Sequence, residues 1–164
     1  MGLFSSLSFR KRSQPDAVAD ATPAVEETVA VGVAPVPEPP AFSAQARAQA
    51  EELVRRVVQE LPTFITVAVV EATTGKILAG QWAGHSGGAV EVAAANAEIV
   101  RQTRQCIEAL QLTDTEQLTD ILITLRYQLH VLRVLSQAEW LLYLAVHTQD
   151  TNPALALAVV QAID

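Results

Sequence analysis

The first clear hydrophobic pattern runs from residue 43 to residue 61, where apolar side chains recur three and four positions apart. This spacing predicts an amphipathic helix, because it places those side chains on one stripe of the helix surface. The stripe contains Ala46, Ala50, Leu53, Val54, Val57 and Leu61. Ser43 is a favourable N-cap for this helix, and Pro62 ends it.

Five segments rich in β-branched and other apolar residues predict strands. They span residues 63–71, 76–82, 120–126, 127–135 and 139–147. A short loop with Gly75 joins the first two, which predicts a β-hairpin. The junction between the third and fourth contains no Gly or Asn, so that boundary stays open. The last strand is apolar on both faces, which is typical of a central strand with helices on each side.

Residues 89–111 predict a long helix with two apolar stripes instead of one. The first stripe consists of Ala93, Ala97, Val100, Ile107 and Leu110. The second stripe consists of Val92, Ala95, Ile99, Thr103 and Cys106. One stripe is enough to pack a helix on a sheet, so the second indicates another covering surface, such as a partner chain.

Residues 151–163 predict a last helix, capped by Thr151 or Asn152 and with Pro153 at its first position. The predicted order is therefore α-β-β-α-β-β-β-α. Strands and helices do not alternate through the chain, which disfavours a doubly wound parallel sheet. The expected fold class is α+β, with a five-stranded antiparallel sheet and helices on both faces.

Composition divides the chain into three parts. Residues 13–42 hold six of the eight prolines and a net charge of −5, which predicts a disordered acidic linker. Residues 43–164 form the predicted domain, and residues 1–12 form a tip in which apolar residues precede basic ones. The tip residues of interest are Leu3, Phe4, Leu7, Phe9, Arg10, Lys11 and Arg12.

The tip favours weak contact with a membrane surface or a partner. Its apolar-before-basic order is the reverse of a secretory signal, so we expect a cytoplasmic protein, peripheral at the inner membrane surface through this tip. Gly2 and Ser6 match the M-G-x-x-x-[ST] pattern of N-myristoylation. The alternative is an ordinary loose chain end.

Charge and composition disfavour several function classes. A net charge of −7 disfavours a nucleic-acid partner. One cysteine, Cys106, cannot form an internal disulfide, and the sequence has no Cys/His cluster that would predict a metal site. Neither a P-loop nor a G-x-G-x-x-G motif is present, so we expect no cofactor.

Residues 84–88, Gly-His-Ser-Gly-Gly, match the G-x-S-x-G pattern of the α/β-hydrolase nucleophile elbow. The available triad partners are Asp114, Asp120 or Asp150 with His130 or His147. Only one helix and one hairpin precede Ser86, however, and no loop upstream could complete an oxyanion hole. A serine hydrolase is therefore a remote alternative; we expect no catalytic residue, and expect Ser86 to help cap the following helix.

The segments FITVAVVEATTGKILAGQW, AAANAEIVRQTRQCIEAL and LHVLRVLSQAEWLLYLAVHTQDTNPALALAVVQAI carry a family resemblance. In their order and their pattern of residue types they resemble the roadblock/dynein light chain domain, a profilin-like fold that also includes the bacterial MglB-type proteins. The resemblance covers about residues 60–164, and the first helix extends it to residue 43.

The resemblance implies interaction rather than catalysis. Roadblock-like domains form homodimers or heterodimers through the third strand and the long helix, and the dimer serves as a platform for small Ras-like GTPases. Carried to this sequence, it implies an adaptor that pairs with itself or a related roadblock chain. The implied interface residues are Val92, Ala95, Ile99, Thr103, Cys106, Ile121, Ile123 and Leu125.

Profilin-like sheets also serve as small-molecule or signal-sensing modules, with a ligand between sheet and helix. In that alternative, Trp82, Tyr127 and Trp140 would line a pocket instead of packing in the core or an interface.

Overall fold

A computed structural model describes residues 42–84, 87–136 and 139–163. The helices are α1 (Ala44–Glu60), α2 (Ala89–Ala109) and α3 (Pro153–Gln161). The strands are β1 (Thr66–Glu71), β2 (Ile77–Trp82), β3 (Asp120–Thr124), β4 (Gln128–Val134) and β5 (Trp140–His147). The predicted element order and fold class are confirmed. The tip at residues 1–12 and the linker as far as residue 41 lie outside the described residues.

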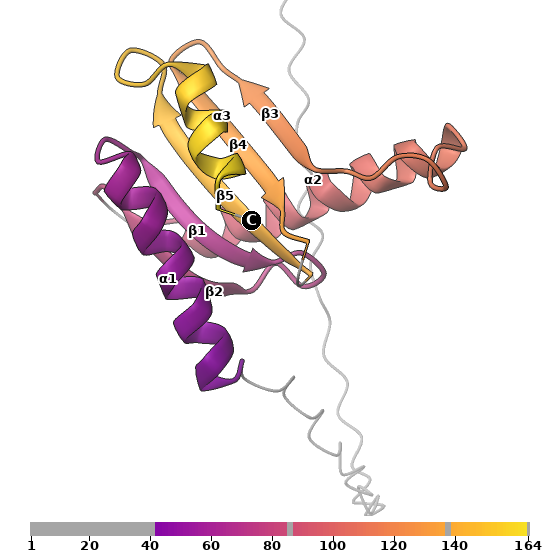
Figure 1. Cartoon of the computed structure of the whole chain (residues 1–164), viewed down its shortest axis with the longest axis horizontal. Helices are drawn as coiled ribbons and strands as arrows, with labels where there is room; N and C mark the ends of the chain where they lie inside the picture. Colours follow the sequence, from indigo (N-terminus) through magenta and orange to yellow (C-terminus); the bar gives the residue numbers. More distant parts are fainter. Residues whose placement is uncertain (1–41, 85–86, 137–138, 164) are drawn as a thin grey trace, which may run out of the picture. The chain divides into compact units, whose positions relative to one another are not determined.

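The strands form one antiparallel sheet in the order β2-β1-β5-β4-β3 (Figure 1). The last strand in the sequence, β5, is central, and its residues 141–146 are all buried. This confirms the central strand that its two apolar faces predicted. The two edges of the sheet are β2 and β3.

Helices α1 and α3 cover one face of the sheet and α2 covers the other (Figure 1). Alternate residues of β5 enter the two cores: Leu142 and Leu144 face α1 and α3, whereas Leu141 and Tyr143 face α2. On the α2 side the core is completed by small and medium side chains of the helix, Ala93 among them. Burial of both sheet faces is the main stabilising contribution in such a layered fold.

Side-chain caps fix the first and last helices. The Oγ of Ser43 accepts the Ala46 N–H at 3.1 Å, as predicted. The Oδ1 of Asn152 accepts the Ala154 N–H at 2.8 Å. In contrast, the N-cap of α2 is Gly88, with φ of +80° and no side-chain cap. Ser86, which was predicted to help cap this helix, lies outside the part of the chain that the structure describes.

The turn between β1 and β2 lies against α2. Gly75 has φ of +72°, a conformation that favours glycine. A Cβ atom on Gly75 would lie 2.7 Å from the Cα of Ala94. The glycine therefore allows both the turn and the close approach of the helix.

The open boundary between the third and fourth strands falls at a two-residue turn. The Leu125 N–H donates to the Gln128 carbonyl at 2.8 Å, which leaves Arg126 and Tyr127 at the tip. The pattern predicts that Tyr127 begins the fourth strand; it lies in the turn instead, with the Arg126 guanidinium 5.1 Å from its ring centroid.

Candidate interaction site

The outer side of strand β3 is open. β3 pairs only with β4, and among the described residues no backbone hydrogen bond joins its outer side to another segment. Its three central residues, 121–123, are all apolar, and Leu122 is 45% exposed. An apolar edge strand is a template for pairing with another chain.

The opposite edge, β2, is built differently. Its register with β1 slips between Val69 and Val70, which marks a β-bulge. Trp82 packs over Gly80 so closely that a Cβ there would lie 2.5 Å from Cη2 of the indole. Bulges are one way in which proteins protect sheet edges from pairing. The register of β3 with β4 is uninterrupted, so the two edges differ in their protection.

Helix α2 exposes most of the second apolar stripe. Val92 is 42% exposed, Ala95 and Cys106 are exposed, and Ile99 and Thr103 are half-buried. The first stripe faces the sheet through Ala93, Ala97 and Val100, all buried. The structure thus separates the two stripes as the spacing predicted, and leaves most of the second exposed.

The sequence pattern places Leu110 in the first stripe, and this prediction is wrong. Leu110 is the C-cap of α2 and is 67% exposed. At about 100° per residue, Leu110 lies roughly 100° around the helix from Ala93 and on the same side as Val92. It therefore extends the exposed stripe.

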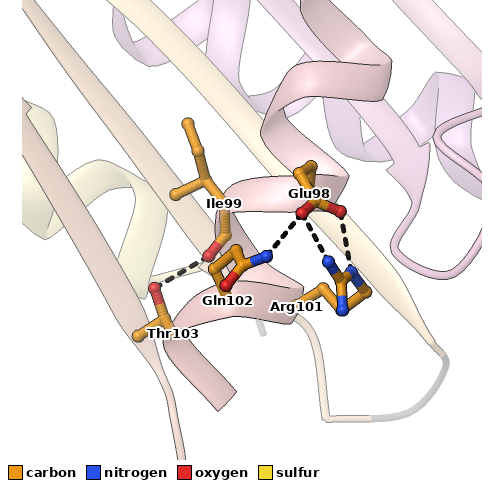
Figure 2. A network of polar contacts seen from close by, with 5 residues as sticks. All are labelled: Glu98, Ile99, Arg101, Gln102 and Thr103. Atoms are coloured by element: carbon orange, nitrogen blue, oxygen red, sulfur yellow. Dashed lines mark hydrogen bonds and ion pairs between the residues drawn. The ribbon is translucent and has the colours of Figure 1, made fainter. Parts of the chain in front are cut away.

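Figure 2 shows how the polar side of α2 is ordered. Arg101 donates to both carboxylate oxygens of Glu98, at 2.7 and 2.6 Å, and Gln102 donates to one of them at 2.8 Å. The hydrogen bonds from Arg101 and Gln102 lower the pKa of Glu98 to about 2. The Thr103 hydroxyl donates to the Ile99 carbonyl at 2.8 Å. Thr103 thereby satisfies its polar group within the helix and adds a methyl group to the stripe.

The β3 edge and the α2 stripe lie on the same face of the sheet. Ile121 and Ile123 are partly buried against the same core cluster as Ile99 of α2. Leu125 follows in the turn and is 50% exposed. The structure thus brings the implied residues of the strand and helix to one layer of the domain.

An ion pair lies at the beginning of β3. Arg133 Nη1 lies 3.0 and 3.1 Å from the carboxylate oxygens of Asp120, and the two side chains are only 14% and 11% exposed. Gln161 of α3 donates to the same carboxylate at 3.1 Å. Asp120 is therefore neutralised within its own chain although it lies at the sheet edge.

A polar cluster that the sequence did not reveal lies beneath α2. His130 Nδ1 is 2.7 Å from the Tyr143 hydroxyl, and its Nε2 is 3.1 Å from Oε1 of Gln128. Asn96 of α2 is 5% exposed and belongs to this cluster. Burial lowers the pKa of His130; burial also raises the pKa of Tyr143, and the Asn96 amide opposes that rise.

The three aromatic residues of the sensing alternative do not come together. Trp140 packs against the core beneath α1 and α3, Trp82 lies over Gly80 at the β2 edge, and Tyr127 is 66% exposed in its turn. A cavity of about 810 Å³ lies between the C-terminal half of α2 and the end of β4. None of the three aromatic residues lines it.

The residues of the hydrolase alternative are also dispersed. His85 and Ser86 lie outside the described residues. Asp120 bonds Gln161 on the α3 side of the sheet, whereas His130 bonds Tyr143 on the α2 side. Asp114, Asp150 and His147 are exposed. The described ranges contain neither a cluster of potential metal ligands nor a helix long and apolar enough to cross a membrane.

The sequence matches no family model and no curated protein. Solved structures, however, share its fold. MglB from Myxococcus xanthus superimposes with a TM-score of 0.64 at 8% identity, covering 75% of this chain and 87% of that chain. This chain has the roadblock fold. A Roadblock/LC7 domain from Streptomyces avermitilis matches with a TM-score of 0.54 at 13% identity, over 69% of this chain and 92% of that one.

A third structure of this fold, the gliding protein MglB from Thermus thermophilus, matches with a TM-score of 0.57 at 14% identity, covering 75% of this chain and 84% of that chain. The fold resemblance that the sequence carried is therefore confirmed, while the implied interface residues stay a prediction.

Proposed function

We propose that this chain is a non-enzymatic, dimeric roadblock-type module that scaffolds or regulates a small Ras-like GTPase. One observation carries the proposal: an open apolar edge strand lies on the same face of the sheet as an exposed apolar helix stripe. Exposed apolar surface of this kind is typical of protein interfaces. A solved structure of the same fold, with a TM-score of 0.61 at 12% identity, is titled "MglB with tetrameric arrangement", which also favours self-association.

In the proposed dimer, β3 pairs with β3 of a second copy and the α2 stripes pack together. The partner is an identical chain or a related roadblock chain. Pairing would satisfy the open backbone groups of β3, and the helix contact would cover Val92, Ile99 and Cys106. The helix contact would add buried apolar surface to the backbone hydrogen bonds of the strand pairing.

The GTPase is proposed to dock across the paired helices. The polar side of α2 is already ordered by the hydrogen bonds among Glu98, Arg101 and Gln102. Side chains that are ordered before binding lose less conformational freedom when a partner docks. The family resemblance, rather than any contact in this chain, supplies the GTPase as the partner class.

Affinity capture with the full chain as bait, in the presence of GTP or GDP analogues, tests the partner class. We expect a Ras-like GTPase to be enriched in one nucleotide state. A dimeric bait that captures no GTPase in either state would contradict the regulatory role and leave the dimer standing.

A charge-inverted variant provides the matched control. Combining Glu98→Arg with Arg101→Glu keeps the pairing within the helix and reverses the pattern that a partner meets. We expect capture to fall at least tenfold while light scattering gives an unchanged dimer mass. Unchanged capture would indicate that the GTPase docks on another surface of the dimer.

A further inference from the structure

The hydrogen-bond pattern of the β3–β4 pair shows which backbone groups of β3 are available. The Leu125 N–H bonds the Gln128 carbonyl, and the Val134 N–H bonds the Thr119 carbonyl. In an antiparallel pair, the residues that bond to the neighbour alternate with those that do not. The odd-numbered residues of β3 therefore face β4. The groups that point outward belong to Asp120, Leu122 and Thr124.

We infer that two copies of this chain pair through β3 with the two-fold axis at Leu122, a refinement that rests on the proposed dimer. In this register the backbone N–H and C=O of Leu122 bond the backbone of Leu122 in the second copy. The backbone groups of Asp120 likewise bond those of Thr124 in the second copy, and the reverse pair forms by symmetry. All the outward groups of the strand are then used within regular β-structure. The axis is perpendicular to the sheet, so both α2 helices lie on the same face.

The side chains agree with this register. Leu122, which is 45% exposed in the single chain, would lie directly opposite Leu122 of the second copy. Ile121 would face Ile123 on the other side of the sheet, extending the apolar layer beneath α2. Asp120 would face the Thr124 hydroxyl, and its charge is already neutralised by Arg133. No like charges meet across this interface strand.

The neighbouring registers use the strand less well. An axis at Ile121 pairs Thr124 with residue 118, and an axis at Ile123 pairs Asp120 with residue 126. Both of these partners lie outside β3, in irregular backbone. Each alternative therefore loses one of the bonding pairs that the Leu122 register makes.

Cysteine cross-linking of the full chain tests the register. Single variants Ile121→Cys, Leu122→Cys and Ile123→Cys are oxidised with copper phenanthroline in air, and disulfides are assigned by peptide mass spectrometry. The parent chain, whose one cysteine is Cys106, is the reference. In this register residue 122 forms a hydrogen-bonded pair with its counterpart, with Cα atoms about 5.5 Å apart, and residues 121 and 123 form a non-hydrogen-bonded pair, about 4.5 Å apart. Both spacings are within disulfide range, whereas diagonal neighbours lie about 7–8 Å apart.

We expect Leu122→Cys to cross-link to itself at least fivefold faster than either neighbour. A mixture of Ile121→Cys and Ile123→Cys should form the mixed disulfide in preference to either self-disulfide. Fastest self-linking at residue 121 or 123 in a confirmed dimer would overturn this register and keep the proposed function. A monomeric mass by light scattering for the parent chain would overturn both.

Discussion

Gly75 occupies a position that other residue types do not fit. Its φ is +72°, and a Cβ atom there would approach the Cα of Ala94 to 2.7 Å, so both features oppose a side chain. We expect Gly75→Ala to lower the free energy of unfolding by about 2 kcal/mol, since a non-glycine residue in this region costs about 1–3 kcal/mol. Urea unfolding measures the change. Gly87→Ala is the matched control, because nothing lies within 4 Å of a Cβ at Gly87, and equal effects would contradict this account.

His130 makes stability depend on pH. Burial lowers the pKa of His130 below its ordinary value of 6.5, so the folded chain binds this proton less readily than the unfolded chain. Stability contributed by the neutral ring is present above about pH 6.5 and is lost as the pH falls through the lowered pKa. We expect the melting temperature to fall between pH 7 and pH 5, and to fall less in His130→Gln. Identical pH profiles for the two proteins would contradict this role.

Single residues show where sequence reasoning reached its limit. The cap at Ser43 follows from local chemistry and was predictable. Buried Asn96 was not, because its burial depends on where α2 crosses the sheet and which residues of β5 lie beneath it. The implied interface residues did not include Leu122. Side chains alternate between the faces of a strand, so three consecutive apolar residues leave the middle one, Leu122, on the more exposed face.

At the scale of elements, the Asp120–Arg133 pair joins β3 to β4 and, through Gln161, to α3. Removing one partner leaves a buried charge uncompensated, which typically costs about 3–5 kcal/mol. We expect Arg133→Leu to destabilise the chain by about 3 kcal/mol in urea unfolding. Arg55→Leu is the control, because its pair with Glu52 is solvent-exposed and should change stability little. Equal losses in both variants would contradict a special role for the β3 pair.

The β3 edge is predicted to be the dimer contact, so a charge at its centre should separate the chains. In Leu122→Asp, two carboxylates would meet at the two-fold axis, and we expect the dissociation constant to rise at least a hundredfold in sedimentation experiments. Leu155→Asp is the matched control on α3, since Leu155 is 52% exposed and does not belong to the proposed contact. If Leu155→Asp separates the chains and Leu122→Asp does not, the dimer contact lies on the α3 face and not at the β3 edge.

The elements themselves were predictable because their periodicity is local, and the predicted spans differ from the observed ones mainly at their ends. The pairing of β1 with β5 was not predictable from the pattern, since about seventy residues separate these strands. The same pairing decides that β2 and β3 become the edges. The candidate site therefore needed the sheet order as well as the helix stripes.

At the scale of the whole domain, the two sheet faces are covered differently. The face beneath α1 and α3 is a closed core, with Leu142 and Leu144 fully buried. The face beneath α2 continues to an open edge and an exposed stripe, as expected of half of a symmetric assembly. MglB and a Roadblock/LC7 domain share this layered fold.

The most direct test of the central claim is the mass of the full chain in solution. Multi-angle light scattering at micromolar concentration is expected to give twice the 17.6 kDa of one chain, at all loading concentrations down to about 1 µM, which corresponds to a dissociation constant in the submicromolar range. A mass of 17.6 kDa that does not rise with concentration would contradict the proposed dimer.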